Sequence, residues 1–386
     1  MSGFKQIFRR SVLQLARRPI YWVAMFIFPL GLMLFLTDMM EEGLPDKVPA
    51  AIIDKDGTSL SRGITQNLGS MQMIDLQTSC NSYTEARHKM QSGEIFGFFM
   101  IPENFEKDLL SGKGPAITFY TNMTYFVPAS LLFKSFKTTA LMSKAGIMLN
   151  VAESAGLSAE QVVPMMQPIN IVTRGLGNPG LNYAIYLCNS FVPCVFQLMI
   201  MLMVCFSLGQ EIKYGGSRRL LAMSHGNMYE ALVAKILPQT IGWWILIMLM
   251  MSWLYCWQGY PMHGSWLWLT VSELMFVVAC QCMAVFFFGL FPNLRLSLSV
   301  CSLLGILSFS LAAFSFPVES MYGSIAIFSY LMPIRYNFLI YIDQALNGLD
   351  IWYSRWWYVA YLIYMLLPLT VIWRIKRFMA RPVYVP

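Results

Sequence analysis

Residues Pro19 to Thr37 read PIYWVAMFIFPLGLMLFLT, an apolar run without a charged side chain. A helix that rises about 1.5 Å per residue needs roughly 20 residues to cross a bilayer core of about 30 Å. This run is long enough, and five similar runs follow it. They are Gly175 to Gln210, Ile236 to Met262, Leu274 to Leu294, Leu296 to Val318 and Trp356 to Trp373. Unbroken apolar runs indicate helices, so the sequence predicts six membrane crossings.

The composition agrees with a membrane protein. Of the 386 residues, 57% are hydrophobic and 12% are charged, about half the charged share of an ordinary soluble domain. The first run is longer than the apolar region of a secretory signal, about 7 to 15 residues, and no A-x-A cleavage pattern follows it. We therefore expect it to be a retained anchor.

The basic residues predict the orientation. If the N-terminus is cytoplasmic, the short segments of the opposite face hold only Arg335 and Arg355. The segments on the cytoplasmic face then hold fourteen basic residues: Lys5, Arg9, Arg10, Arg17, Arg18, Lys213, Arg218, Arg219, Lys235, Arg295, Arg374, Lys376, Arg377 and Arg381. This excess follows the positive-inside rule and predicts that both termini are cytoplasmic.

The predicted fold class is an α-helical polytopic membrane protein with six transmembrane helices and a small α/β extracytoplasmic domain with a helical stalk. The predicted segments are a cytoplasmic interfacial helix at 1–18, crossings at 19–39, 183–208, 230–258, 270–292, 296–316 and 356–374, an extracytoplasmic domain at 40–182, a cytoplasmic coupling segment at 209–229, an outer re-entrant hairpin at 317–354 and a tail at 375–386.

The extracytoplasmic segment alternates strand and helix patterns. Val48 to Ile53, Ile95 to Ile101 and Ala116 to Tyr120 read as strands. A helix pattern begins at Ser59, and Ser82 with Glu85 has the spacing of a capping box. Helical patterns then cover residues 128–150 and 158–166, so a small α/β domain followed by a helical stalk is expected.

Residues 3 to 18 place apolar side chains on one stripe of a helix, with basic residues around it. The stripe is Phe4, Ile7, Phe8, Val12 and Leu15, and the basic residues include Lys5, Arg9, Arg10 and Arg17. This pattern is typical of a helix that lies in the membrane interface. A plain orientation signal is the alternative, although charge alone would not need the apolar stripe.

Sites for chemistry are missing. No G-x-x-x-x-G-K-[ST] phosphate loop occurs, and the three histidines fall on different segments, so neither nucleotide nor metal binding is expected. Glu230 and Glu273 fall at the edges of apolar runs, and no mid-membrane carboxylate is expected. The amides of Asn189, Gln197 and Gln281 lie inside the runs, where hydrogen bonds between helices are the favoured role.

The segment Gln210 to Ser224, QEIKYGGSRRLLAMS, joins the second and third crossings. Gly215 and Gly216 permit a sharp turn, and Leu220 with Leu221 begins an apolar helical face that could dock into a partner. An ordinary basic loop that sets the topology is the alternative.

This segment resembles the coupling region of ABC-2 type permeases: Glu211, Gly215, Leu220 and Leu221 match the family register. Lys235 and Pro238 follow at a family-like distance. Three other stretches are similar to the family in the same order. They are AIIDKDGTSLSR at Ala51 to Arg62, the group Asn178, Pro179, Tyr183, Val192 and Pro193, and the outer-hairpin residues Phe316, Pro317, Met321, Pro333 and Tyr336.

The sequence departs from the family pattern at four positions. Gly216 stands where the family often has Thr, Arg218 where an acidic residue is common, and Ser224 where Pro is usual. Arg335 in the outer hairpin is also unusual. The resemblance nevertheless assigns coupling to the ATPase to Glu211, Gly215, Gly216, Arg218, Arg219, Leu220 and Leu221.

The resemblance implies a transport subunit that is not itself an enzyme, in a bacterial inner membrane. ATP and Mg would be bound by a separate cytosolic ABC ATPase, and no cofactor by this chain. A second permease subunit, identical or paralogous, and a periplasmic adaptor are further expected partners, while nucleic acid is not. A hydrophobic, drug-like or lipidic compound is the expected cargo. An ATP-independent transporter or channel, and a mechanical or sensory protein, are the alternatives.

Overall fold

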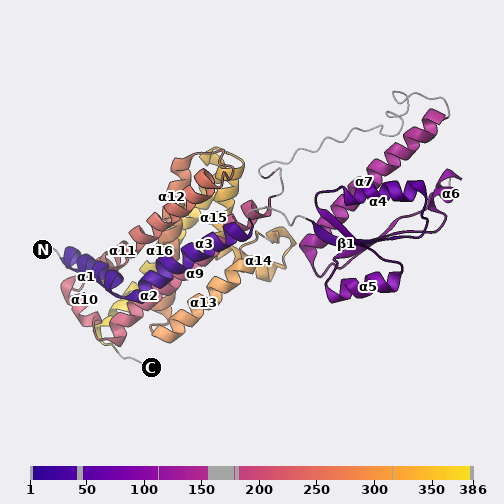
Figure 1. The fold of residues 1–386 in the computed structure, drawn as a ribbon. Coiled ribbons are helices and arrows are strands. Elements are labelled where there is room, and N and C mark those ends of the chain that lie inside the picture. The colour runs from indigo at the N-terminus through magenta and orange to yellow at the C-terminus, as the bar shows by residue number, and fades with distance from the viewer. Residues whose placement is uncertain are drawn as a thin grey trace. The chain divides into compact units, whose positions relative to one another are not determined.

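The computed structural model describes residues 3–40, 47–111, 113–154, 178, 182–314 and 316–382. The chain divides into two compact units, and Figure 1 labels their elements. A helical unit holds Met1–Gly43 and Arg174–Pro386, and an α/β unit holds Leu44–Thr173. Each unit has its own core.

Six helical segments of the helical unit are long and apolar enough to cross a membrane. The first, Pro19–Met39, consists of α2 (Pro19–Trp22), the π-helical turn η1 (Val23–Ile27) and α3 (Phe28–Met39). The others are α9 (Tyr183–Lys213), α11 (Met228–Met251) with the π-helical turn η2 (Ser252–Trp257), α12 (Trp266–Leu290), α13 (Leu294–Leu311) and α16 (Ile351–Ala380). The predicted fold class is confirmed. The chain is a multi-pass membrane protein.

Asparagine side chains fix where three of these helices begin. Asn182 Oδ1 accepts from the backbone N–H of Ala184 at 2.8 Å, and Asn227 and Asn293 cap α11 and α13 in the same way. An asparagine at this position satisfies N–H groups that have no partner inside the helix. An asparagine next to each of these apolar runs therefore marks the residue at which the helix begins.

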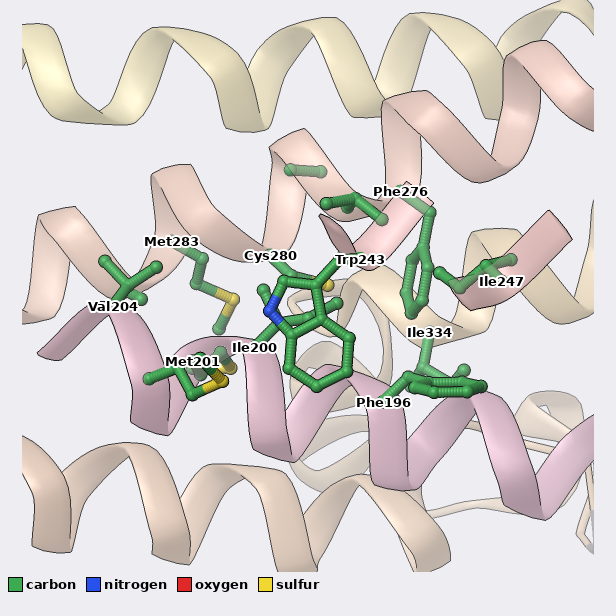
Figure 2. Close-up of a cluster of buried hydrophobic side chains, with 14 of the residues drawn as sticks. Phe196, Ile200, Met201, Val204, Trp243, Ile247, Phe276, Cys280, Met283 and Ile334 are labelled. Carbon is green, nitrogen blue, oxygen red and sulfur yellow. The ribbon is translucent and has the colours of Figure 1, made fainter. Parts of the chain in front are cut away.

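The core of the helical unit packs around Trp243 of α11, which is fully buried (Figure 2). Phe196 of α9 meets it edge to face, with ring centroids 5.9 Å apart. Phe276 of α12 and Ile334 of α15 (Pro333–Tyr341) belong to the same buried cluster. Helices that are far apart in the sequence thus share one interior.

Amide side chains join the helices inside this core. Gln197 Nε2 donates to Ser308 Oγ of α13 at 2.7 Å, and Gln197 Oε1 accepts from the backbone N–H of Ile334 at 2.9 Å. Asn189 accepts from the Tyr255 hydroxyl, and Gln281 accepts from the Thr240 hydroxyl. The predicted role of the three amides, hydrogen bonding between helices, is confirmed.

Between α13 and α16 the chain forms a bent pair of short helices. After the 3-10 turn η3 (Val318–Ser320), α14 (Gly323–Tyr330) precedes α15, and α15 continues into the π-helical turn η4 (Ile342–Leu346). The axes of α14 and of the segment Pro333–Leu346 differ by 79°. This geometry suits either a broken span or a re-entrant loop, and the sequence-based hairpin at 317–354 stays a prediction.

The α/β unit has a four-stranded sheet in the order β2-β1-β3-β4. The strands are β1 (Val48–Asp54), β2 (Ile74–Ser79), β3 (Gly97–Ile101) and β4 (Thr118–Thr121). β1 runs parallel to β2 and β3, and β4 is antiparallel to β3. α4 (Ser59–Gly69) and α7 (Phe126–Ser154) cover one face, and α5 (Tyr83–Ser92) covers the other (Figure 1). A short helix, α6 (Phe105–Leu110), follows β3.

The sequence patterns located three of the four strands and the capping box. Ser82 Oγ accepts from the Glu85 N–H at 3.2 Å, and the Glu85 carboxylate accepts from the Asn81 N–H at 3.1 Å. β2 was not predicted, because Asp75 and Gln77 interrupt its apolar pattern on an edge of the sheet. The expected helix at 158–166 lies outside the described residues.

Candidate functional site

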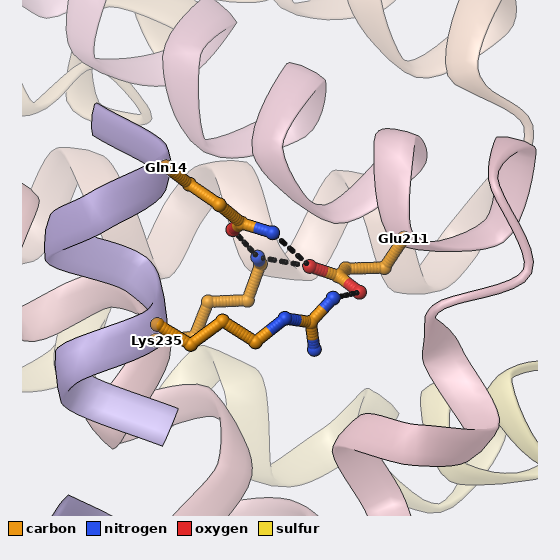
Figure 3. Close-up of polar contacts among 4 residues, drawn as sticks. Gln14, Glu211 and Lys235 are labelled. Carbon is orange, nitrogen blue, oxygen red and sulfur yellow. Dashed lines mark hydrogen bonds and ion pairs between the residues drawn. The ribbon is translucent and has the colours of Figure 1, made fainter. Parts of the chain in front are cut away.

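Four side chains meet at the end of the helical unit where α1 (Gly3–Arg17) and α10 (Ser217–Met223) lie, which we call the α10 end (Figure 3). Glu211 Oε2 accepts from Arg10 Nη2, and Glu211 Oε1 accepts from Lys235 Nζ, both at 2.7 Å. Gln14 bonds to both Glu211 and Lys235 at 3.3 Å. We call Arg10, Gln14, Glu211 and Lys235 the ion cluster.

Two members of the ion cluster are withdrawn from solvent, whereas the Arg10 side chain is 26% exposed. Glu211 is 4% exposed and Lys235 is 1% exposed. Charges in such surroundings are stable only when they are paired and hydrogen-bonded, and removing one partner of a buried pair costs about 3–5 kcal/mol. The cluster therefore fastens α1, α9 and α11 together at the point where α9 ends.

Two glycines shape the turn after Glu211. Gly215 has φ +68°, a conformation that side-chain-bearing residues seldom adopt. A Cβ at Gly216 would meet Glu211 Oε2 and Arg10 Nη2. The glycine that departs from the usual Thr of the resembled family thus leaves room for the ion cluster in this chain.

The connector α10 presents two faces. Leu220 and Leu221 are buried, while Arg218 and Arg219 are exposed. α10 packs against α1, α11 and α16 of the same unit. The predicted coupling residues therefore lie together at the α10 end, with the leucines turned inward and the arginines available to a partner. Their role in coupling stays a prediction.

Helix α1 buries only part of its predicted apolar stripe. Gly3, Ile7 and Ser11 are its buried residues, whereas Phe4 and Phe8 are half-buried and Arg9 is exposed. A Cβ at Gly3 would meet the backbone carbonyl of Met223 at the end of α10. α1 thus lies directly on α10, and Val12 remains 41% exposed.

The predicted hairpin residues are only partly brought together. Arg335 is 8% exposed and lies 4.8 Å from the ring centroid of Tyr330, whose carbonyl accepts from the Tyr336 hydroxyl at 2.9 Å. Pro333 begins α15 and is buried. Pro317 and Met321 instead flank η3, and Pro317 is exposed.

The carboxylate of Glu273, which the sequence places at the outer edge of the fourth crossing, is buried. Glu273 lies in α12, is 2% exposed and accepts from Asn337 Nδ2 of α15 at 2.9 Å. From the sequence, Glu273 lies at the edge of the uncharged run that begins at Leu274. The first two turns of α12, which precede that run, mix Trp and Leu with Thr and Ser. Its partner is 64 residues away, and no local pattern predicts the contact.

Sequence reasoning also missed how Arg10, Gln14 and Lys235 combine. The one usable signal was Lys235 itself, a cation next to an apolar run, which needs a buried anionic partner. In the described part of the chain, no three His, Cys, Asp or Glu side chains gather as a metal site would require.

The spanning helices and the α/β unit inserted after the first span define a multi-pass membrane protein that carries a separately folded insertion. A family model described as ABC-2 family transporter protein matches residues 19–374. The chain belongs to the ABC-2 transporter family, as the resemblance predicted.

The chain is also similar to the linearmycin resistance permease protein LnrN of Bacillus subtilis (strain 168). The two are 33% identical over 104 residues, which is 27% of this chain and 26% of that protein. The match thus spans about a quarter of the relative's length.

Proposed function

We propose that this chain is the membrane-spanning subunit of an ABC exporter that moves a hydrophobic, drug-like or lipidic compound out of the cytoplasm or inner membrane of a bacterium. A separate cytosolic ATPase binds ATP and Mg and supplies the driving force. Both termini lie in the cytoplasm. A second permease subunit, identical or paralogous, completes the pathway, and a periplasmic adaptor is a further proposed partner.

The ion cluster is the observation that carries the coupling role. α10 buries Leu220 and Leu221 against the helical unit, and Glu211 at its base is bonded to α1 and α11. A push on the exposed side of α10 is therefore passed to α1, α9 and α11 together, because one carboxylate is shared among them. Packed helices with two arrangements can convert such a push into a change of the pathway.

Two observations support an apolar cargo. A groove of about 660 Å³ lies between the first span, α9 and α13, and its lining is apolar apart from Tyr21, Ser299 and Ser302. Apolar lining with few polar groups is the usual character of sites for hydrophobic ligands. The similar Bacillus subtilis protein is, by its name, a resistance permease. We infer an antibiotic-like compound as the first cargo class to test.

The test uses proteoliposomes that contain this chain together with its cognate ABC ATPase. Leu220→Ala with Leu221→Ala should leave membrane insertion intact and lower cargo-stimulated ATP hydrolysis at least fivefold. Ala222→Ser is the matched control, because Ala222 lies exposed on the same helix. Unchanged hydrolysis and transport in the leucine variant would refute the coupling role.

Glu273 favours one second candidate, transport driven by a proton gradient. Such a transporter needs a carboxylate buried among its spanning helices, and Glu273 has that position. In proteoliposomes without the ATPase, this candidate predicts uptake that follows an imposed pH gradient and is lost in Glu273→Gln. The ABC exporter predicts no movement under the same conditions.

A further inference from the structure

A basic pocket opens beside the ion cluster. It has a volume of about 670 Å³ and is formed by α1, the residue that follows it and α10. Five of its lining residues are arginines: Arg9, Arg10, Arg17, Arg18 and Arg219. No acidic residue lines it. We call this space the arginine pocket.

The positive charge of the arginine pocket is largely unmatched. Among the ion pairs of the described residues, Arg10 with Glu211 is the one that involves any of these five arginines. Arg10 uses Nη2 for that pair, while its Nη1 is buried and has no hydrogen-bond partner within the described part of the chain. A buried guanidinium nitrogen without an acceptor is costly, so Arg10 Nη1 calls for an anion as an acceptor from outside the described residues.

The position of the pocket indicates where that anion comes from. Arg18 directly precedes Pro19, the first residue of the first span. Apolar side chains of α1 and of the start of the first span, on either side of Arg18, are exposed. Val12, Leu13, Ile20, Trp22 and Val23 have exposed fractions of 41% to 50%. Trp22 Nε1 donates to the Ala16 carbonyl at 3.0 Å, which holds the indole at the level where α1 meets the span. Indole rings favour the boundary between headgroups and acyl chains.

We propose that the arginine pocket binds the phosphate headgroup of an anionic phospholipid, with the acyl chains lying along the exposed apolar residues of α1 and the first span. Arginine forms paired, charge-assisted hydrogen bonds to phosphate oxygens, and basic pockets beside spanning helices suit acidic headgroups. The apolar border favours a lipid over free phosphate, which needs none. The span boundary at Arg18 favours a lipid over a soluble partner.

Arg10 would link the bound lipid to the ion cluster. Its Nη2 stays on Glu211 while its Nη1 takes a phosphate oxygen, so the lipid holds α1 against α9 and α11. Occupancy of the pocket therefore stabilises the docked position of α1. This inference does not depend on which compound the protein exports.

The test titrates full-length protein in neutral detergent with phosphatidylglycerol, and follows bound lipid by native mass spectrometry and thermal unfolding by tryptophan fluorescence. Phosphatidylcholine and inorganic phosphate are titrated in parallel. We expect that, of the three compounds, only phosphatidylglycerol binds saturably and raises the Tm of the protein. An equal rise with phosphatidylcholine, or with inorganic phosphate, would overturn the assignment to an anionic lipid.

The triple variant Arg9→Gln, Arg17→Gln, Arg18→Gln should weaken phosphatidylglycerol binding at least tenfold. Its matched control is Arg374→Gln, Lys376→Gln, Arg377→Gln, which removes the same charge from exposed positions near the end of α16. Equal weakening in both variants would mean that net charge alone attracts the lipid, and the pocket would not be a site. If the triple variant does not fold, Arg17→Gln alone should still weaken binding about threefold, and unchanged binding would contradict the proposal.

Discussion

At the scale of single residues, the charges around Glu211 are unequal in number. One carboxylate faces two cations, Arg10 and Lys235, in a nearly closed space. Losing Lys235 leaves an even pair, whereas losing Glu211 leaves two cations side by side without an anion. The consequences of the two losses should therefore differ.

Glu211→Gln should lower the free energy of unfolding by about 3–5 kcal/mol, because it leaves the buried Lys235 and the partly exposed Arg10 without their shared anion. Lys235→Met should cost less, and Glu211→Gln combined with Lys235→Met should recover part of the loss. Thermal unfolding of the purified protein in detergent measures all three variants. A smaller loss in Glu211→Gln than in Lys235→Met would show that the cluster is not held by this balance.

Residue-scale contacts were the least predictable part of the site. The sequence marked Glu211, Arg10 and Lys235 separately, but their partners are 201 and 24 residues away. Neither helical periodicity nor apolar runs report on which helices become neighbours. Gln14 carried no signal at all, since an amide at the edge of a basic helix resembles any solvated side chain.

At the scale of elements, α1 shows that an apolar stripe describes a buried face only in part. Of the predicted stripe Phe4, Ile7, Phe8, Val12 and Leu15, Ile7 is fully buried beside Gly3 and Ser11, whereas Val12 is exposed. Arg10 and Gln14 face the helical unit, where Arg10 donates to Glu211 and Gln14 accepts from Lys235. In the sequence, a buried helix face made of polar side chains has the same pattern as a face exposed to solvent.

Gly3→Ala should loosen α1, because a Cβ at this position would meet the backbone carbonyl of Met223. Overpacking against a rigid neighbour costs about 1–3 kcal/mol. Hydrogen exchange should rise in α1 and α10 but not in α12. Gly31→Ala is the control, since no atom lies within 4 Å of a Cβ built there. Equal exchange in both variants would mean that α1 does not depend on this close approach.

At the scale of the whole molecule, composition and run lengths were sufficient to predict six spans, and alternating strand and helix patterns predicted the inserted α/β unit. They sufficed because a bilayer imposes a length on every crossing. The order of the strands in the sheet was not predictable, since it depends on contacts between segments that no periodicity encodes. The two units nevertheless have separate cores, so each can be studied for its own stability.

The α/β unit should lose stability in acid through Asp56. A hydrogen bond from the Thr58 hydroxyl, at 2.6 Å, is the largest cause of the lowered pKa of Asp56, and the Glu106 N–H adds to it. A group with a lowered pKa in the folded state stabilises above its ordinary value, here 3.8, and this contribution is lost as the pH falls through the lowered pKa.

Residues 47–154 expressed alone should unfold cooperatively, and the gap in Tm between this fragment and its Asp56→Asn variant should stay constant above the ordinary pKa of 3.8 and narrow as the pH falls below it. Thr58→Val keeps the Asp56 carboxylate but removes its hydrogen bond. In a fragment that carries Thr58→Val, the Tm difference caused by Asp56→Asn should therefore be smaller. Melting curves followed by circular dichroism measure this. A gap that stays constant down to pH 3 would contradict the role given to Asp56.

The shared carboxylate of Glu211 also sets an order for biosynthesis. Arg10 emerges from the ribosome 201 residues before its partner Glu211. At roughly 5–20 residues per second, the first helix waits on the order of 10 to 40 seconds before its ionic partner exists. During that interval its charges can be satisfied only by water and headgroups at the membrane surface. The N-terminal helix is thus made first and docks later, so a nascent chain that ends before Glu211 would leave it undocked.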